Sequence, residues 1–141
     1  AAGLAAGVEE RWFASPRGEL DRVVGYVFLT RFERDGHQSC ELAYGIDAAL
    51  TGQGLMTEAL QCALRHARET LGFTCTNARY DVDNHASARL LQRLGFVPIG
   101  VAPAHAWLAG AWRDHVLVTR VDREGPPTNP QTRPLTGTAA P

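Results

Sequence analysis

The chain has 141 residues, of which 45% are hydrophobic and 21% are charged, a composition typical of one globular domain with a core and not of a disordered chain. Its 14 basic side chains, all arginines, are balanced by 15 acidic ones, so no basic excess indicates a direct nucleic-acid partner. The lack of lysine disfavours the P-loop and pyridoxal phosphate classes of protein, because both require one.

The N-terminus and the cysteines bear on the location of the protein. The chain starts with "AAGLAAGVEERW", which has no cationic leader, so we expect no signal peptide and interpret it as the remainder of an incomplete N-terminus that ends a helix. No apolar run reaches the roughly 18 residues of a membrane span. Cys40, Cys62 and Cys75 form no C-x-x-C pair, so we expect small buried side chains in a reducing compartment, the cytoplasm.

The first clear elements in chain order are two strands. Residues 22–32, "RVVGYVFLTRF", are rich in β-branched and aromatic side chains, and residues 38–46 follow after a turn at "ERDG". The two segments are expected to pair as an antiparallel hairpin. In the second strand, Glu41 shares its face with small and polar residues, whereas the larger apolar residues alternate onto the other face.

Two helices and four strands are predicted in the rest of the domain. Apolar residues at three- and four-residue intervals indicate a helix from Gly54 that ends at Gly72, and a strand over residues 73–82 follows. A second, shorter helix is expected to begin at an N-cap, Asp83 or Asn84, and to end at Gly95. The remaining predicted strands are residues 96–101, 105–109 and 112–121, with a turn at residue 110.

These elements predict one domain over residues 1–122. Residues 123–141 contain five of the eight prolines and almost no large apolar side chains, so they are expected to form a disordered tail.

The turn "TGQG", residues 51–54, connects a predicted strand to the first helix. In such a unit the unpaired N–H groups of the first helical turn, together with the helix dipole, form a site for an anion such as phosphate. Gly52 and Gly54 leave this backbone accessible, because a Cβ atom would hold a phosphate away from it. The dinucleotide fingerprint G-x-G-x-x-G is not met, since its third glycine falls on Thr57. A flexible glycine turn without a ligand is the alternative.

Three longer segments carry more information together than any one of them alone. They are "LAYGIDAALTGQGLMTEAL", "NHASARLLQRLGF" and "WLAGAWRDHVL". In this order and spacing they resemble the GNAT N-acetyltransferases, and within them the ribosomal-protein-alanine N-acetyltransferases of the RimJ/RimL type. The resemblance covers about residues 9–122. It implies an α/β (α+β) acyltransferase fold with a mixed, mostly antiparallel sheet flanked by helices.

The resemblance implies acetyl-coenzyme A as the co-substrate. The family's loop pattern, Q/R-x-x-G-x-G/A, is met at Gly54 but has Thr51 in its first place and Met56 in its last. The diphosphate would bind the backbone amides of residues 52–57, namely Gly52, Gln53, Gly54, Leu55, Met56 and Thr57.

In this family two parallel strands splay apart and the pantetheine arm lies between them. The resemblance places the opening between the strand that ends at Ile46 and the strand at residues 73–82. It implies that the Ile46 N–H faces the thioester oxygen, that Asn84 contacts the pantetheine, and that Ser87 protonates the departing thiolate. From the residues alone, Asn84 could equally be only a helix N-cap and Ser87 a solvated helical serine.

The remaining candidate residues concern the acceptor. Glu41 is either a general base that acts through water or an ordinary solvent-facing strand residue. His105 lies near a position where some related enzymes have a glutamate, so it is either a substitute base or a surface histidine. Tyr44 and Trp107 are candidates for the wall of the acceptor pocket, or for the core. Residues 113–115 either line the acceptor site or form a polar cluster beside a turn.

The expected function is transfer of an acetyl group from acetyl-coenzyme A to a primary amine, by direct attack and without a metal. We expect the acceptor to be a protein N-terminus, such as that of a ribosomal protein. An α-amine has a pKa near 8, against about 10.4 for lysine, and therefore needs less help from a base. The alternatives are a small amine or an antibiotic as acceptor, or a non-catalytic acyl-coenzyme A-binding domain. The last gains support because family members have further elements before the region in which this chain starts. A homodimer is compatible with the sequence.

Overall fold

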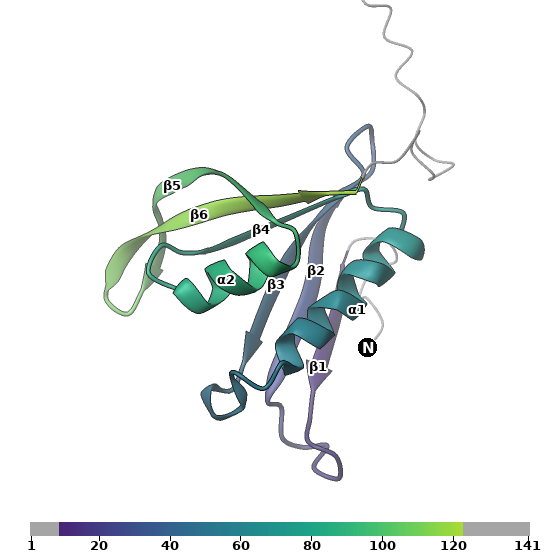
Figure 1. Ribbon diagram of the computed structural model, residues 1–141, viewed down its shortest axis with the longest axis vertical. Helices are drawn as coiled ribbons and strands as arrows, with labels where there is room; N and C mark the ends of the chain where they lie inside the picture. The colour runs from purple at the N-terminus through teal and green to yellow at the C-terminus, as the bar shows by residue number, and fades with distance from the viewer. Residues whose placement is uncertain (1–8, 123–141) are drawn as a thin grey trace, which may run out of the picture.

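The computed structural model describes residues 9–122, which form one six-stranded sheet with two α-helices packed on it (Figure 1). In chain order the elements are β1 (Glu10–Ala14), β2 (Gly25–Glu33), β3 (Ser39–Ile46), the short 3-10 helix η1 (Ala48–Leu50), α1 (Leu55–Glu69), β4 (Cys75–Asp81), α2 (His85–Arg93), β5 (Val97–Leu108) and β6 (Ala111–Val121). The strands lie in the order β1-β2-β3-β4-β6-β5, and β3 and β4 are the parallel pair among antiparallel neighbours. The predicted fold class is therefore confirmed.

The described residues do not test the domain boundary predicted at residue 122. The predicted Pro-rich tail, residues 123–141, lies outside the described residues, and so do the first eight residues of the N-terminal segment. The boundary at residue 122 therefore stays a prediction. Neither of the two α-helices in the described part of the chain is long and apolar enough to cross a membrane.

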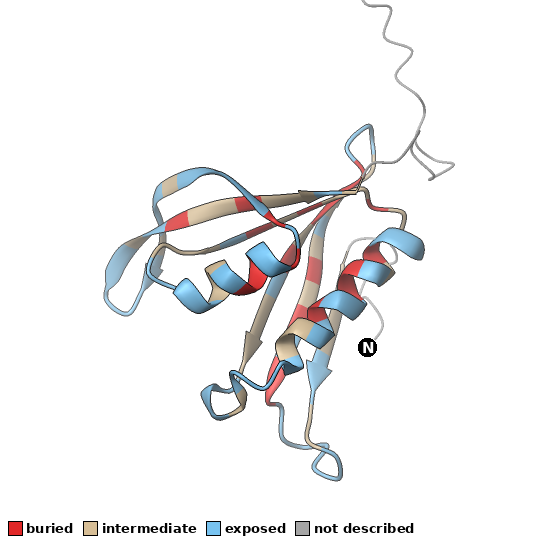
Figure 2. Cartoon of the chain, viewed as in Figure 1, coloured by how far each residue is buried: buried red, intermediate tan, exposed pale blue. Residues whose placement is uncertain are grey.

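The hydrophobic core lies between the two helices and one face of the sheet. Leu29 of β2 and Leu60 of α1 have no exposed surface. Figure 2 shows buried residues along the side of α1 that faces the sheet and in the middle of the strands beneath it. One contiguous cluster joins the buried residues of α1 to those of α2, Leu90 and Leu91, so both helices cover the same face. The three- and four-residue spacing predicted both helices correctly.

Glycines end both helices, as the sequence predicts. Gly72 follows α1 with φ of 74° and Gly95 follows α2 with φ of 89°, in the left-handed region that other residues disfavour. Each is followed by a phenylalanine, Phe73 or Phe96, that is almost completely buried in the core. The glycine therefore turns the chain sharply, so that the next aromatic side chain anchors the following strand.

Strand β1 corrects the interpretation of the N-terminal segment. Glu10, Arg11 and Trp12 belong to a strand that pairs with β2 along its whole length, not to the end of a helix. The ring of Trp12 meets the ring of His66 from α1 edge-on at 5.5 Å, and the Glu10 carboxylate lies 2.7 Å from His66 Nε2. A five-residue strand beside an Ala-rich stretch has almost no local signal, because its stability comes from contacts with β2 and α1.

The last hairpin also differs from prediction. Residues 96–101 and 105–109 were expected as two strands, but they form one long edge strand, β5, whose register with β6 shifts between Ala102 and Ala106. Pro103 lies in this irregular stretch, where a proline is tolerated because it has no N–H to donate. The N–H of the next residue, Ala104, donates to Asp114 Oδ1 at 2.8 Å. The irregularity bends the strand without ending it.

The three cysteines are free and have different surroundings. Cys40 is buried in the core, and this burial raises the pKa of its thiol to about 11. Cys75 is half-buried, with its Sγ 3.3 Å from the hydroxyl of Thr119. Cys62 is exposed on α1, which corrects the expectation that all three are buried.

Candidate functional site

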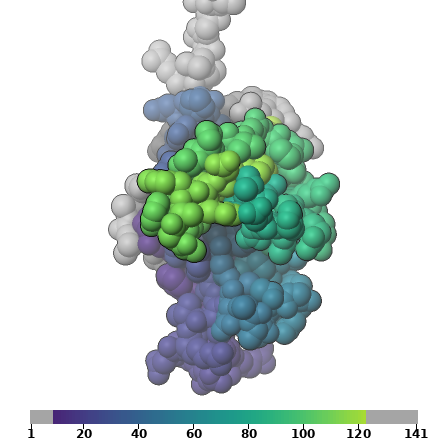
Figure 3. Space-filling view, turned by 90° about the vertical axis from the view of Figure 1, so that its left-hand side faces the viewer, coloured from purple at the N-terminus to yellow at the C-terminus, as the bar shows by residue number. Residues whose placement is uncertain are grey.

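The two parallel strands at the centre of the sheet separate along their length. Beyond the paired stretch, β3 stays with β2 as far as Ile46, and β4 stays with β6 as far as Asp81. Within the described chain, the register between β3 and β4 consists of the pairs Ser39–Cys75, Cys40–Thr76 and Glu41–Asn77. Strands β1–β3 with α1 form one arm, and strands β4–β6 with α2 form the other. Figure 1 shows β3 and β4 diverging, and Figure 3 shows the two arms as two masses with a recess between them. This is the splay that the family resemblance implied.

The edge of β3 that faces the opening can be identified from its hydrogen bonds. The N–H of Asp47, just after the strand, donates to the carbonyl of Val24 on the β2 side at 2.7 Å. Successive residues of a strand direct their N–H groups to opposite edges. The N–H of Ile46 therefore points away from β2 and towards the opening, which is the orientation that its predicted role requires.

Residues 51–54 form an exposed turn at the same end of the sheet. Gly52 and Gly54 have φ of 78° and 74°. Gly54 is the N-cap of α1 and has no side chain to accept a hydrogen bond from the first turn, and the backbone bond closest to this end joins the Glu58 N–H to the Gly54 carbonyl at 3.1 Å. The N–H groups of residues 55–57 therefore point out of the helix end, where the dipole favours an anion. The predicted bare backbone is present.

Two side chains of this turn of helix point in different directions. Met56, which departs from the family's loop pattern, is half-buried and packs against the core. Leu55 is 44% exposed. Because Met56 points inwards, its bulk does not cover the backbone amides at the helix end.

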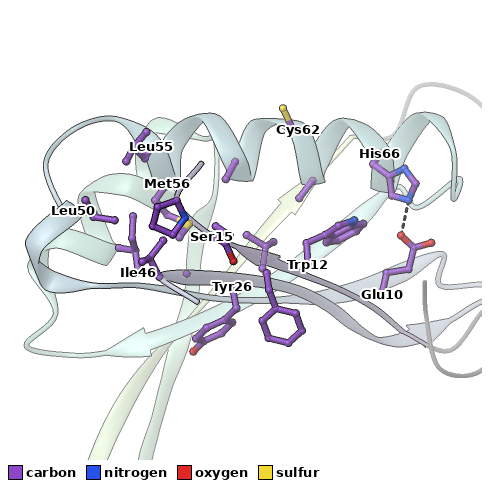
Figure 4. Close-up of a pocket in the computed structure, with 18 residues that line it drawn as sticks. Glu10, Trp12, Ser15, Tyr26, Ile46, Leu50, Leu55, Met56, Cys62 and His66 are labelled. Carbon is purple, nitrogen blue, oxygen red and sulfur yellow. Dashed lines mark hydrogen bonds and ion pairs between the residues drawn. The ribbon is translucent and has the colours of Figure 1, made fainter. Parts of the chain in front are cut away.

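An apolar cavity of about 750 Å³ lies beside this helix end, between α1 and strands β1–β3 (Figure 4). Ile46, Leu55 and Met56 line one end, and Trp12 and His66 line the other. The aromatic ring of Tyr26, also at its rim, points away from α1. Three of the predicted cofactor-binding residues therefore border this cavity as well as the glycine turn.

The start of α2 brings three predicted residues together. Asn84 is the N-cap: its Oδ1 accepts a hydrogen bond from the backbone N–H of Ser87 at 3.1 Å. The hydroxyl of Tyr44, from β3, donates to Ser87 Oγ at 3.0 Å. The cap occupies the oxygen of the Asn84 side chain and leaves its amide NH₂ group for a ligand. Burial raises the pKa of Tyr44, whereas its hydrogen bond with Ser87 acts in the opposite direction.

Glu41 lies at the last residue pair before the strands separate. Its side chain is on the face opposite to the apolar residues of β3, as predicted, and is 19% exposed. Arg79 of β4 approaches one carboxylate oxygen at 2.8 Å, and Arg31 of β2 approaches the other at 3.4 Å. Glu41 borders a small polar pocket of about 240 Å³ with Asn77 on the same side of the sheet. It is therefore across the sheet from Tyr44 and Ser87, and held by two arginines that sequence reasoning did not connect to it.

His105 and Trp107 lie on the other arm, in the β5–β6 hairpin. The ring of His105 is 5.6 Å from the ring of His115, and Trp107 meets Trp112 edge-on at 5.5 Å. Trp107 is 59% exposed, so it is not a core residue. These ring contacts lie within the hairpin itself, and they do not include Tyr44, Ser87 or Glu41.

Arg113 of β6 holds the segment that leads into α2. Its guanidinium donates two hydrogen bonds to the carboxylate of Asp81, at 2.7 and 2.9 Å, and one to Asp83. These bonds hold the pKa of Asp81 well below its ordinary value and raise that of Arg113. Of the two interpretations of residues 113–115, the polar cluster describes these contacts. The cluster fixes the position at which Asn84 and Ser87 begin their helix.

The lowered pKa of Asp81 leads to a prediction on pH dependence. A carboxyl whose pKa is lower in the folded than in the unfolded protein, about 3.9 for aspartate, stabilises the fold above that value and loses this contribution as the pH falls. We therefore expect the Tm of the wild type to decrease more steeply between pH 5 and pH 3 than the Tm of Asp81→Asn. Thermal melting followed by circular dichroism measures both. Equal slopes for the two proteins would contradict the role of this ion pair.

The family model described as Acetyltransferase (GNAT) domain matches residues 4–97. The chain is 37% identical to the [ribosomal protein uS5]-alanine N-acetyltransferase of Escherichia coli strain K12 over 95 residues, which are 67% of this chain and 49% of that protein. It is 32% identical to the probable N-acetyltransferase YjcK of Bacillus subtilis strain 168 over 110 residues, 78% of this chain and 61% of that protein.

A solved structure is also similar. The ribosomal-protein-S5-alanine acetyltransferase of Vibrio fischeri superposes with a TM-score of 0.69 at 27% sequence identity, covering 72% of this chain and 55% of that one. The chain thus spans about half to three fifths of the length of these relatives.

Proposed function

Because the chain belongs to the GNAT acetyltransferase family, we propose that it transfers the acetyl group of acetyl-coenzyme A to a primary amine. One observation carries this proposal. The parallel strands β3 and β4 separate beyond the Glu41–Asn77 pair, and the glycine-capped start of α1 and the start of α2 lie beside the open end. Ligands of α/β sheets bind outside the carboxyl ends of parallel strands, where such an opening exists.

The residues present fit this co-substrate. The amides of residues 52–57 would hold the diphosphate, because Gly54 offers no side chain that competes for them. The Ile46 N–H would serve as the oxyanion donor at the thioester, a contribution of about 10²- to 10³-fold in rate for donors of this kind. Asn84 would hold the pantetheine through its amide NH₂ group. Acetyl-coenzyme A supplies the activated acetyl group, and the protein's task is to orient it and to manage two protons.

The two protons belong to the attacking amine and to the leaving thiol. We assign Glu41 as the base that takes the first through a water molecule, and Ser87 as the acid that supplies the second. The two side chains lie on opposite faces of the sheet, on either side of the point where β3 and β4 separate. The reacting amine and thioester would meet in the opening between these strands, with the base approaching from one face and the acid from the other, so that the amine attacks the thioester directly without a covalent enzyme intermediate.

We propose the α-amine of a protein N-terminus as the acceptor. Tyr44 lies at the proposed reaction centre, whereas His105 and Trp107, on the separate β5–β6 hairpin, would contact residues of the acceptor farther from the amine. The name of the Escherichia coli relative, which specifies an alanine of ribosomal protein uS5, supports this choice. The alternatives are a small amine or an antibiotic, and a domain that binds acyl-coenzyme A without turnover. A cytoplasmic location and a homodimer belong to the same proposal.

The proposal is tested by following the release of free thiol from acetyl-coenzyme A. Peptides with an N-terminal alanine are the substrates, and the same peptides with a blocked N-terminus are the matched control. We expect thiol release with the free peptides, together with a mass increase of one acetyl group at the N-terminus. Tight binding of coenzyme A without turnover of any amine would support the non-catalytic alternative, and turnover of a small amine alone would change the acceptor.

Replacing Glu41 with glutamine should lower turnover by about tenfold at pH 7 and by much less at pH 9. An α-amine with a pKa near 8 is about one-tenth neutral at pH 7 but mostly neutral at pH 9, so the need for a base disappears. Steady-state rates at both pH values give the measurement. A deficit that is the same at both would mean that Glu41 acts by holding Arg31 and Arg79 and not as a base.

A further inference from the structure

A hydrogen bond between side chains of β3 and α2 crosses the opening between the separated strands at the proposed reaction centre. The phenol of Tyr44, on β3, donates to Ser87 Oγ, on α2, at 3.0 Å. The ring of Tyr44 is half-buried and packs against the core cluster. The backbone of Ser87 is fixed by the Asn84 cap. Both partners are therefore positioned by contacts that do not depend on a ligand.

The direction of this hydrogen bond matters for proton transfer. Because Ser87 Oγ accepts the proton of Tyr44, its own O–H is left to donate to a third group. That third group would be the sulfur, if Ser87 acts as the acid. Tyr44 would then be the first member of a chain that runs from phenol to hydroxyl to thiolate.

We propose that Tyr44 is the positioning residue for Ser87 and supplies, through the Ser87 hydroxyl, the proton that the leaving thiolate takes up. This inference rests on the proposed acetyl transfer. As the C–S bond breaks, Ser87 gives its proton to the sulfur and takes that of Tyr44. The resulting phenolate regains a proton from solvent. The proton that the amine loses when the N–C bond forms passes through water to Glu41 and from there to solvent, so the total number of protons is unchanged. Atoms and charges balance without a further reactant.

The acidities of the groups favour this route over Ser87 alone. A phenol has a pKa of about 10 and a thiol one of about 8.5, so the transfer to sulfur is only slightly uphill. An aliphatic hydroxyl that acted alone would be left as an alkoxide, which is far more basic than a phenolate. Burial, with a smaller contribution from Tyr80 of β4, raises the pKa of Tyr44, which keeps the phenol protonated before the reaction but makes its transfer more uphill, and the hydrogen bond with Ser87 acts against this rise.

The first test is a double-mutant cycle on turnover. We expect Tyr44→Phe to lower kcat about tenfold and Ser87→Ala to lower it about 100-fold, with KM for acetyl-coenzyme A little changed in both. The double variant should be no slower than Ser87→Ala, because Tyr44 acts only through Ser87. Ser87→Thr, which keeps a hydroxyl, should recover most of the rate. Tyr26→Phe, with its ring directed away from α1, is the matched control and should be unchanged.

The second test needs no turnover. Tyrosine is labelled at Cζ, and the NMR signal of Tyr44 in the free protein is assigned as the one that Tyr44→Phe removes. This signal should shift in Ser87→Ala. It should keep its position in the control variant Ser15→Ala. A signal that does not respond to Ser87→Ala would overturn the inference.

The outcomes separate the two levels of the proposal. If the wild type turns over peptides and the effects of Tyr44→Phe and Ser87→Ala multiply, the proton route is wrong and acetyl transfer stands. Full activity of Tyr44→Phe has the same meaning. If the wild type binds coenzyme A but acetylates no amine, the proposed function fails, and the proton route fails with it.

Discussion

Replacing Gly52 and Gly54 together with alanine should weaken the binding of coenzyme A by about 100-fold, or roughly 2.7 kcal/mol. The two added methyl groups would stand between the diphosphate and the backbone amides at the start of α1. In the free protein neither methyl group would meet another atom within 4 Å, so no clash disturbs the fold. The loss should therefore appear in the affinity, measured by isothermal titration calorimetry.

The fold does bear one cost in this variant, and a matched control removes it from the comparison. Alanine at a positive φ costs about 1–2 kcal/mol per residue. Gly18 and Gly110 have φ of 89° and 79°, and a Cβ at either position would also meet nothing within 4 Å. The double variant Gly18→Ala/Gly110→Ala should thus lose similar stability and keep its affinity. If the two double variants bind coenzyme A with equal affinity, the glycine turn is not part of the binding site.

Replacing Ser87 with alanine should lower kcat by about 100-fold, which is at the low end for loss of a general acid. The hydroxyl that we propose as the proton donor to the leaving thiolate disappears, whereas the backbone N–H that Asn84 caps remains. Alanine is also the better helix former, so α2 should be at least as stable as before. Steady-state kinetics at saturating acetyl-coenzyme A, with a thermal melt of the same sample, give the measurement.

The control for this variant is Ser15→Ala. Ser15 follows β1 and lines the apolar cavity beside α1, but it has no role in the proposed proton transfers. A loss of affinity for coenzyme A that accounts for the whole effect of Ser87→Ala would show that Ser87 binds the co-substrate and does not act as an acid. Unchanged kcat would show that it does neither.

The elements and their order followed from local patterns in the sequence. The 3.6-residue spacing of α1, its glycine stop at Gly72 and the N-cap at Asn84 depend on interactions within a few residues, and all of them agree with the structure. Strand β1 could not be found in this way, because its five residues are stabilised by β2 and by the contact of Trp12 with His66, 54 positions later.

The candidate site also has a part that depends on local interactions and a part that depends on long-range contacts. The glycine turn is local and could be predicted from its residues, while its ligand came from the family resemblance. Apart from the local Asn84 cap, the contacts that position the candidate residues are long-range: Tyr44 and Ser87 are separated by 43 residues, and Arg113 and Asp81 by 32. Pairs of this kind leave no trace in a single sequence, since each partner alone has an ordinary local explanation.

Among the strand pairs of the described sheet, β3 and β4 have the shortest ladder, with three residue pairs. A ligand bound between β3 and β4 would contact the strands on both sides of this junction. It would hold together two parts of the sheet that are otherwise joined mainly through the shared core. A free ligand concentration of 100 times the dissociation constant adds about 2.7 kcal/mol to the free energy of unfolding. Much of that gain should appear as slower amide hydrogen exchange on both sides of the junction at once.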